Sequence, residues 1–140
     1  MKQLLILIGI FFTVGAMAQS DTINHRPLPA LGSLHFAENI MDIQEEHRTD
    51  LKVIAQHLKK HPELGILIIG HTDDVGERDD NNIVALKRAK KVQDYLLYKG
   101  VNKKQISYGG RGEDNPLLRD TTDYARHINR RVELRYFYKD

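Results

Sequence analysis

The sequence GHTDDVGERDDNNIVALKRAKKV, residues 70–92, decides the fold of this chain. It follows an apolar run at residues 66–69, which is bounded by two glycines and predicts a buried strand. Polar and turn-forming residues at 71–82 predict a loop, and a helical apolar spacing then predicts an amphipathic helix. The apolar positions of that helix are Ile83, Leu86, Ala89, Val92 and Leu96. In α/β domains, ligands usually bind where a strand ends and a helix begins, so a binding site is expected here.

The patterns around this stretch complete a small domain. Asn39 is expected to be a helix N-cap or a turn residue, and Gly100 is expected to end the second helix. The remaining predicted elements are a strand at 31–37, a helix from 40 to before Pro62, a strand at 105–108, a glycine loop at 109–112, one helical turn at 124–129 and a strand at 131–138. This order predicts an α/β (α+β) two-layer sandwich with helices packed on one face of a mixed sheet.

The first eighteen residues have the pattern of a secretory signal. A charged start at Lys2 precedes a short apolar run and the small-residue sequence Ala-Met-Ala at 16–18. We therefore expect a cleaved signal peptide at 1–18, a flexible lead-in at 19–30 and one domain at 31–140. An uncleaved membrane anchor is the alternative, although the apolar run is shorter than the roughly 20 residues that a span requires.

Composition excludes several classes of function. The chain carries 21 basic and 19 acidic residues, a formal net charge of +2, and loss of the signal peptide with Lys2 would leave +1. A charge so close to zero gives no reason to expect nucleic acid as a partner. The chain has no cysteine, which excludes disulfides, thiolate metal ligands and a lipidated cysteine. A domain exported without disulfides must depend on its core for stability.

Asp73 and Arg88 are the first pair of candidate binding residues. A carboxylate accepts hydrogen bonds from an ammonium group, and a guanidinium can hold a carboxylate through two parallel bonds. Together they could hold the head group of a zwitterionic amino acid. From their spacing alone, an ion pair between the two side chains is the favoured interpretation.

Metal sites are the next alternative. Asp74, Asp79 and Asp80 offer oxygen ligands for calcium, but their spacing is not that of an EF-hand, and they suit the start of a helix better. His57, His61 and His71 could suggest zinc, but the H-E-x-x-H motif is absent. We expect no metal site. Without an activated nucleophile, we also expect no enzymatic activity, and a hydrolase is the least supported hypothesis.

Several separated motifs resemble one known family. They are GHTDDVG, Asn81, RAKKVQDYL, YGGRGEDNP and NRRVEL, and their order and gaps are similar to those of the C-terminal domain of the OmpA family. This domain also occurs in peptidoglycan-associated lipoproteins and in flagellar stator proteins. The resemblance covers residues 31–138 and implies a βαβαββ sandwich that binds the diaminopimelate residue of peptidoglycan stems, without a cofactor.

The resemblance also implies roles for individual residues. Asp73 would bind the ammonium group of diaminopimelate, and Arg88 would bind its carboxylate. Asn39 and Asn81 correspond to polar residues of the family's site, and Arg130 is a second candidate for the ligand's carboxylates.

Two departures from the family pattern open an alternative function. Val75 stands where many relatives have Thr or Ser, so only its backbone could contact a ligand, and Val84-Ala85 replaces a Leu-Ser pair. The primary hypothesis is a peptidoglycan-binding protein of a Gram-negative periplasm, associated with the outer membrane or with other envelope proteins. The alternative is an assembly subunit that uses the same fold to bind a protein partner.

Overall fold

The structure is a computed structural model that describes residues 31–140. The expected signal peptide at 1–18 and lead-in at 19–30 lie outside the described residues. The elements are β1 (Ser33–His35), α1 (Glu45–Lys60), β2 (Leu64–Gly70), α2 (Arg78–Tyr98), the 3-10 helix η1 (Lys103–Gln105), β3 (Ile106–Gly110), α3 (Asp123–Asn129) and β4 (Arg131–Tyr138). No helix within residues 31–140 is both long and apolar enough to cross a membrane.

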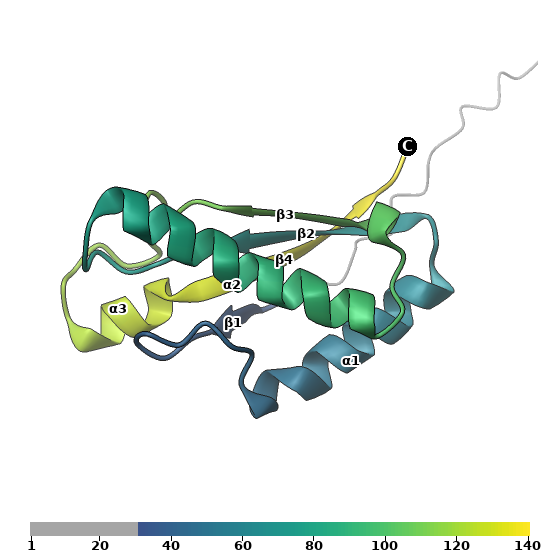
Figure 1. Cartoon of the computed structure of the whole chain (residues 1–140), viewed down its shortest axis with the longest axis horizontal. Coiled ribbons are helices and arrows are strands. Elements are labelled where there is room, and N and C mark those ends of the chain that lie inside the picture. The colour runs from purple at the N-terminus through teal and green to yellow at the C-terminus, as the bar shows by residue number, and fades with distance from the viewer. Residues whose placement is uncertain (1–30) are drawn as a thin grey trace, which may run out of the picture.

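The four strands form one mixed sheet in the order β1-β4-β2-β3. β4 runs antiparallel to both β1 and β2, and β3 runs parallel to β2. α1 and α2 cover one face of the sheet, and α3 lies near the ends of β1 and β4 (Figure 1). This arrangement confirms the predicted sandwich of helices on one face of a mixed sheet.

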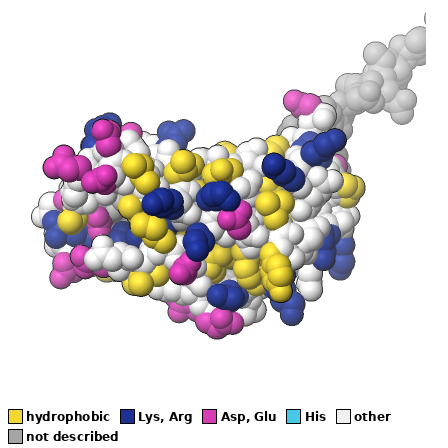
Figure 2. Space-filling model, in the orientation of Figure 1, with side chains coloured by type: hydrophobic (Ala, Val, Ile, Leu, Met, Phe, Trp, Pro, Cys, Tyr) yellow, Lys and Arg dark blue, Asp and Glu magenta, His cyan; other side chains and the backbone are white. Residues whose placement is uncertain are grey.

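The core lies between α1, α2 and the sheet. Its largest fully buried apolar side chains are Phe36, Leu51, Leu58, Ile66, Ile68, Val92, Leu96 and Val132. Alternate residues of β2 point into this layer, which is why Ile66 and Ile68 are fully buried while Leu67 and Ile69 are not. On the outer face of the helices, hydrophobic side chains are interspersed with charged ones of both signs (Figure 2).

α1 begins at Glu45, so the prediction of a helix from Ile40 is wrong. Asn39 lies in a turn with φ of 56°, a left-handed conformation that Asn tolerates better than most residues. The N-cap of α1 is Gln44, so of the two roles predicted for Asn39 only the turn is found. The segment between β1 and α1 is therefore irregular. It crosses the end of the sheet and does not extend α1.

α2 begins at Arg78, four residues before the predicted loop ends. Asp79 and Asp80 lie in its first turn, where their negative charge is favourable at the helix N-terminus, as the sequence suggested. The predicted apolar stripe is partly wrong, because Ile83 and Leu86 are exposed. The buried face consists instead of Asn81, Ala85, Arg88, Ala89, Val92, Gln93 and Leu96. Polar side chains thus occupy positions where a purely apolar stripe was expected.

Two glycines allow α2 to lie directly on the sheet. A Cβ atom at Gly70 would be 1.9 Å from the carbonyl oxygen of Ala85, and one at Gly110 would be 2.6 Å from the amide nitrogen of Leu86. β3 extends through Gly110, so the prediction of a glycine loop at 109–112 is wrong for its first two residues. These glycines bring the first half of α2 against the ends of β2 and β3.

The remaining boundaries agree well with the sequence patterns. β4 covers the predicted 131–138, and α3 is longer than one turn because Thr122 caps it by accepting from the amide of Ala125 at 3.2 Å. β1 is shorter than the predicted 31–37. Gly100, with φ of 86°, follows the last turn of α2 as expected.

Replacement of Gly110 with alanine should destabilise the protein by about 2 kcal/mol, because the added methyl group would overlap the backbone of α2. Gly109→Ala is the matched control in the same strand, since the nearest atom to its Cβ would be the flexible Ile69 Cδ1 at 3.7 Å. That variant should stay within about 0.5 kcal/mol of the wild type. Urea unfolding of both variants measures the difference, and equal destabilisation would contradict the close contact between α2 and β3.

Candidate functional site

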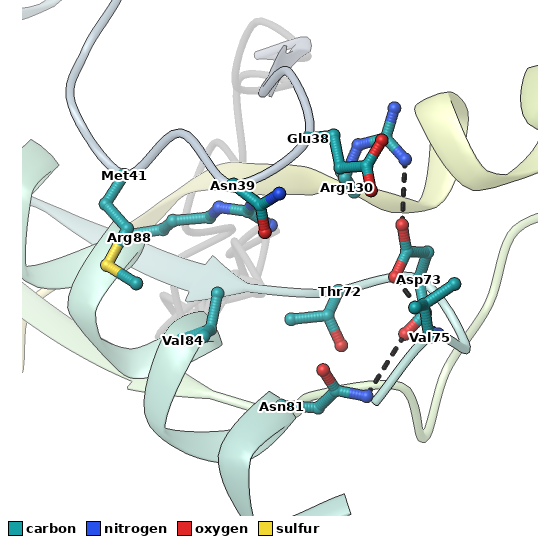
Figure 3. Close-up of a pocket in the computed structure, with 10 residues that line it drawn as sticks. All are labelled: Glu38, Asn39, Met41, Thr72, Asp73, Val75, Asn81, Val84, Arg88 and Arg130. Atoms are coloured by element: carbon teal, nitrogen blue, oxygen red, sulfur yellow. Dashed lines mark hydrogen bonds and ion pairs between the residues drawn. The ribbon is translucent and has the colours of Figure 1, made fainter. Parts of the chain in front are cut away.

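A small pocket opens where β2 ends and α2 begins. Its volume is about 140 Å³, and its walls come from the segment before α1, the end of β2, α2 and the start of β4. The residues that line it are Glu38, Asn39, Met41, Thr72, Asp73, Val75, Asn81, Val84, Arg88 and Arg130 (Figure 3). All six site residues predicted from the sequence are among them. A pocket this small can admit the head group of a ligand but not a whole peptide.

Asp73 forms the acidic side of the pocket and is 7% exposed. One carboxylate oxygen accepts a hydrogen bond from the Val75 amide at 3.2 Å, and the other is 2.8 Å from Nη1 of Arg130. Within residues 31–140, the ion-pair partner of Asp73 is thus Arg130, not the Arg88 that the sequence suggested as an alternative. A carboxylate has about four acceptor positions, so Asp73 can still accept a bond from a ligand.

Arg88 approaches the pocket from α2 and is only 2% exposed. Its Nε donates to the carbonyl oxygen of Ile40 at 3.0 Å, its Nη1 donates to that of His71 at 3.4 Å, and its Cζ is 5.2 Å from the centre of the Phe36 ring. Burial lowers the pKa of the guanidinium. Asp73 opposes this shift, and the charge of Arg130 adds to it. The side chain is therefore a rigidly held cation, with Nη2 not used by either of these hydrogen bonds.

Arg130 lies opposite Arg88, at the junction of α3 and β4. Its Nε donates to the carbonyl oxygen of Phe36 at 3.1 Å, which holds the segment after β1 in place. That segment brings Glu38 and Asn39 to the rim, where Glu38 lies beside Arg130 and Asn39 beside Arg88 (Figure 3). The pocket is therefore assembled from parts of the chain that are far apart in sequence.

Asn81 closes the lower side of the pocket and links two loops. Its Nδ2 donates to Glu113 Oε2 at 2.7 Å and lies 3.5 Å from the carbonyl oxygen of Asp73. The side chain is 6% exposed, so these bonds hold both its amide group and the loop after β2 in position. The contact of Glu113 with Asn81 also places the loop that follows β3 against the site.

Thr72 contributes an unused polar atom at the centre of the pocket. Its side chain is buried, and its Oγ1 has no hydrogen-bond partner within residues 31–140. An unsatisfied buried hydroxyl is costly unless water or a ligand bonds to it. The charges of the pocket also balance, because the two guanidinium groups of Arg88 and Arg130 and the two carboxylates of Asp73 and Glu38 line it together. A zwitterionic group therefore matches its electrostatics.

Comparison with known proteins agrees with the fold and with the motifs. Residues 35–130 match the OmpA family. The chain belongs to the OmpA family. The crystal structure of the peptidoglycan-associated lipoprotein from Burkholderia pseudomallei superposes with a TM-score of 0.74 at 31% identity, covering 75% of this chain and 89% of that one.

Two relatives of this OmpA-family chain show how much of a longer protein it corresponds to. It is 33% identical to the peptidoglycan-associated lipoprotein of Pseudomonas putida over 108 residues, which are 77% of this chain and 64% of that protein. It is 38% identical to the peptidoglycan-binding protein ArfA of Mycobacterium tuberculosis over 84 residues, 60% of this chain and 26% of that protein. The chain therefore spans less than two thirds of either relative.

The alternatives for metal ions gain no support from the structure. Within the described part of the chain, no cluster of three or more His, Asp or Glu side chains could hold a metal ion. Asp74 pairs with Arg126 of α3 at 2.9 Å. The rings of His57, on α1, and His61, at its C-terminal end, contact each other in a tilted arrangement, with ring centres 4.4 Å apart.

Sequence reasoning missed four residues of the pocket: Glu38, Met41, Thr72 and Val84. Thr72 lies inside the GHTDDVG motif, so its neighbours Asp73 and His71 could have indicated it. Glu38 and Met41 gave no signal, because the segment that carries them was predicted to be the start of a helix.

His71 is the other residue near the site with unusual chemistry. Its backbone oxygen accepts from Arg88, but its ring lies on the opposite face of the sheet and is 3% exposed. Burial and the charge of Arg131 lower its pKa from 6.5 to about 4, although Glu133 opposes the shift. The folded protein therefore holds this ring neutral at mildly acidic pH, where the unfolded chain would protonate it.

Acidification should therefore destabilise the fold through His71. Because its folded pKa is depressed, the unfolded chain binds more protons between pH 6.5 and about pH 4, and the stability from the neutral ring is lost as the pH falls through this window. From pH 7 to pH 5 this one residue should lower the free energy of unfolding by about 2 kcal/mol. Urea unfolding at both pH values, for the wild type and for His71→Asn, isolates the effect. If the variant shows the same pH dependence as the wild type, His71 is not its source.

Proposed function

We propose that this protein binds peptidoglycan non-covalently, through the free amino acid end of a diaminopimelate side chain in the peptide stem. The observation that carries the proposal is the pocket at the end of β2, which is small, preformed and balanced in charge. Diaminopimelate has an ammonium group and a carboxylate on one carbon at the far end of its side chain. A pocket lined by two cations and two anions suits that group better than it suits a simple anion or cation.

Each charged group then has a distinct part in binding. The ligand ammonium donates to the remaining acceptor positions of Asp73, with Glu38 at the rim as a second anion. The ligand carboxylate accepts from Arg88 and Arg130, whose guanidinium groups are already held by backbone carbonyls. Thr72 Oγ1, which is buried and unsatisfied, offers one more hydrogen bond. Val75 contributes through its backbone.

The pre-ordering of these groups favours binding. Since the arginine side chains are fixed before the ligand arrives, little conformational entropy is lost on association. Charge-assisted hydrogen bonds contribute about 1.5–3 kcal/mol each. Two or three of them are consistent with an affinity in roughly the micromolar range after association costs.

The names of the relatives support peptidoglycan as the partner, without indicating which part of it is bound. One solved structure and one relative are peptidoglycan-associated lipoproteins, and ArfA is named a peptidoglycan-binding protein. The proposal includes a location in the periplasm of a Gram-negative cell envelope, with export directed by a signal peptide at 1–18. There it attaches itself and any envelope partner to the wall without a catalytic step or a cofactor.

Loss of the Arg88 guanidinium should weaken binding strongly. Calorimetric titration of the exported protein (residues 19–140) with a stem peptide that ends in meso-diaminopimelate should give saturable binding. Arg88→Ala should weaken this binding by about thirtyfold, or about 2 kcal/mol. Lys87→Ala removes an exposed charge from the preceding helical position and should bind like the wild type. Circular dichroism checks that each variant is folded. If Arg88→Ala, Asp73→Ala and the wild type are all retained equally by purified sacculi, the wall is not bound through this pocket and the proposal fails.

A stem peptide with lysine in place of diaminopimelate tests the finer part of the proposal. Lysine keeps the ammonium group but lacks the carboxylate, so the two guanidinium groups would remain without their partner. We expect at least tenfold weaker binding of the lysine peptide in the same titration. Equal affinity for both peptides would leave wall binding intact but would exclude recognition of the diaminopimelate carboxylate.

A further inference from the structure

The face of the sheet that α1 and α2 leave uncovered has a second cavity, of about 350 Å³. Side chains alternate along each strand, so Leu67, Ile69 and His71 of β2 point away from the helices. In β4, Glu133 pairs with Ile69 and Arg135 pairs with Leu67 across the ladder. In β3, Gly109 lies beside Ile69 and has no side chain. The face is hollow at this point, with an apolar floor and a charged border.

Residues 115–117, in the loop after β3, form the end wall of this cavity. Pro116 and Leu117 line it, and Leu117 is 55% exposed. Asn115 is bound on two sides: its backbone oxygen accepts from Arg131 at 3.1 Å, and its side-chain oxygen, in the amide orientation that satisfies both amide atoms, accepts from Arg111 at 3.0 Å. The wall is thus fixed to the sheet through arginine side chains.

The border of the cavity is cationic. Arg111, Arg131 and Arg135 face a single acidic side chain, Glu133. Arg131 is 1% exposed and already satisfied, because it bonds Glu133 at 2.6 Å together with the backbone oxygens of Asn115 and Asn129. Arg135 bonds the other oxygen of Glu133 at 2.6 Å and remains largely exposed. Arg111 has no ion-pair partner within residues 31–140, so the cavity carries an excess of positive charge.

His71 gives an independent sign that a ligand is missing. Both of its ring nitrogens lack a hydrogen-bond partner within residues 31–140, although the ring is 3% exposed and lines the cavity. Nε2 is 3.6 Å from Glu133 Oε1, which is too far for a hydrogen bond. Buried polar atoms are normally satisfied, so a donor or acceptor from outside the chain is expected here.

We propose that this cavity binds a small organic anion, whose charged group contacts Arg111, Arg135 and His71 and whose apolar part lies on Leu67 and Ile69. Guanidinium groups hold carboxylate, phosphate and sulfate oxygens equally through paired bonds, so the shared requirement is an oxyanion. The cavity is larger than a bare inorganic ion and lies at the lower end of the range for small-molecule sites, roughly 300–1,000 Å³. The floor supplies apolar contact and the border supplies charge. This site is separate from the diaminopimelate pocket and does not depend on its function.

Methyl sulfate and phenyl sulfate are suitable probes, because both carry one negative charge that does not change with pH in the range of interest. Titration of the exported protein, followed by NMR, should show saturable shifts of the Leu67 and Ile69 amides and of the His71 ring. Phenyl sulfate should bind about tenfold more tightly than methyl sulfate, because its ring covers the apolar floor. Equal affinities would show that the ions bind only to surface charge and would overturn the proposal.

Variants of the exposed arginines give the matched comparison. The double variant Arg111→Gln and Arg135→Gln should lose at least tenfold in affinity for phenyl sulfate. Arg48→Gln, which removes an exposed arginine from α1, should have no effect. Both sets of positions are exposed, so the variants should fold. Unchanged binding by the double variant, or shifts centred on Arg88 and Asp73 instead of His71, would overturn the assignment.

The pKa of the His71 ring is an independent test of anion contact. If the residues of this cavity had only a structural role, adding the anion would leave that pKa unchanged. The ring is faced by Arg131, Arg135 and Glu133 from β4 and by Arg111 from the segment after β3. Burial first, and then the charges of these arginines, lower its pKa to about 4. A bound anion opposes that effect, so saturation with phenyl sulfate should raise the pKa of His71 by about one pH unit. Ring nitrogen shifts measure this change. A pKa that stays the same in the complex would exclude contact between the anion and His71.

Discussion

The site depends on the burial of one guanidinium group. Arg88 is almost inaccessible to water, yet its charge is retained because two backbone carbonyl oxygens accept its N–H groups and the Phe36 ring lies beneath it. Those carbonyls belong to Ile40, in the segment before α1, and to His71, at the end of β2. One side chain of α2 therefore joins three parts of the chain at the pocket.

The ion pair between Asp73 and Arg130 has a complementary effect. A buried carboxylate without a partner would be costly, so the pair lets the pocket exist in the absence of ligand. A zwitterionic ligand would find each of its charges already matched and would not have to separate the pair completely, because a carboxylate can accept several hydrogen bonds. The same arrangement disfavours a simple anion, which would have to approach both Asp73 and Glu38.

The sequence patterns correctly predicted the features that depend on local interactions along the chain. The alternation in 131–138 gave β4 its bounds, because a half-buried strand needs a repeat of two. Motif order identified Asp73 and Arg88, and the structure brings both to one pocket. The predictions that were wrong concern features set by contacts between distant parts of the chain. Ile83, for example, is exposed because Asn81 and Arg88 occupy the buried face of α2. The burial of Arg131 comes from a loop sixteen residues earlier, which strand alternation cannot reveal.

The tripeptide 71–73 contributes to cavities on both faces of the sheet: the ring of His71 lines one, and the side chains of Thr72 and Asp73 line the other. A sheet is only one residue thick, so the side chains of His71 and Thr72, which are adjacent in sequence, point to opposite faces and into separate cavities. Residues that line only one cavity, such as Glu38 and Asn39 on one side and Arg111 and Arg135 on the other, can change without affecting the other cavity. Residues 71–73 must fit both cavities, so substitutions should be tolerated least at these three positions, where only the sheet separates the cavities.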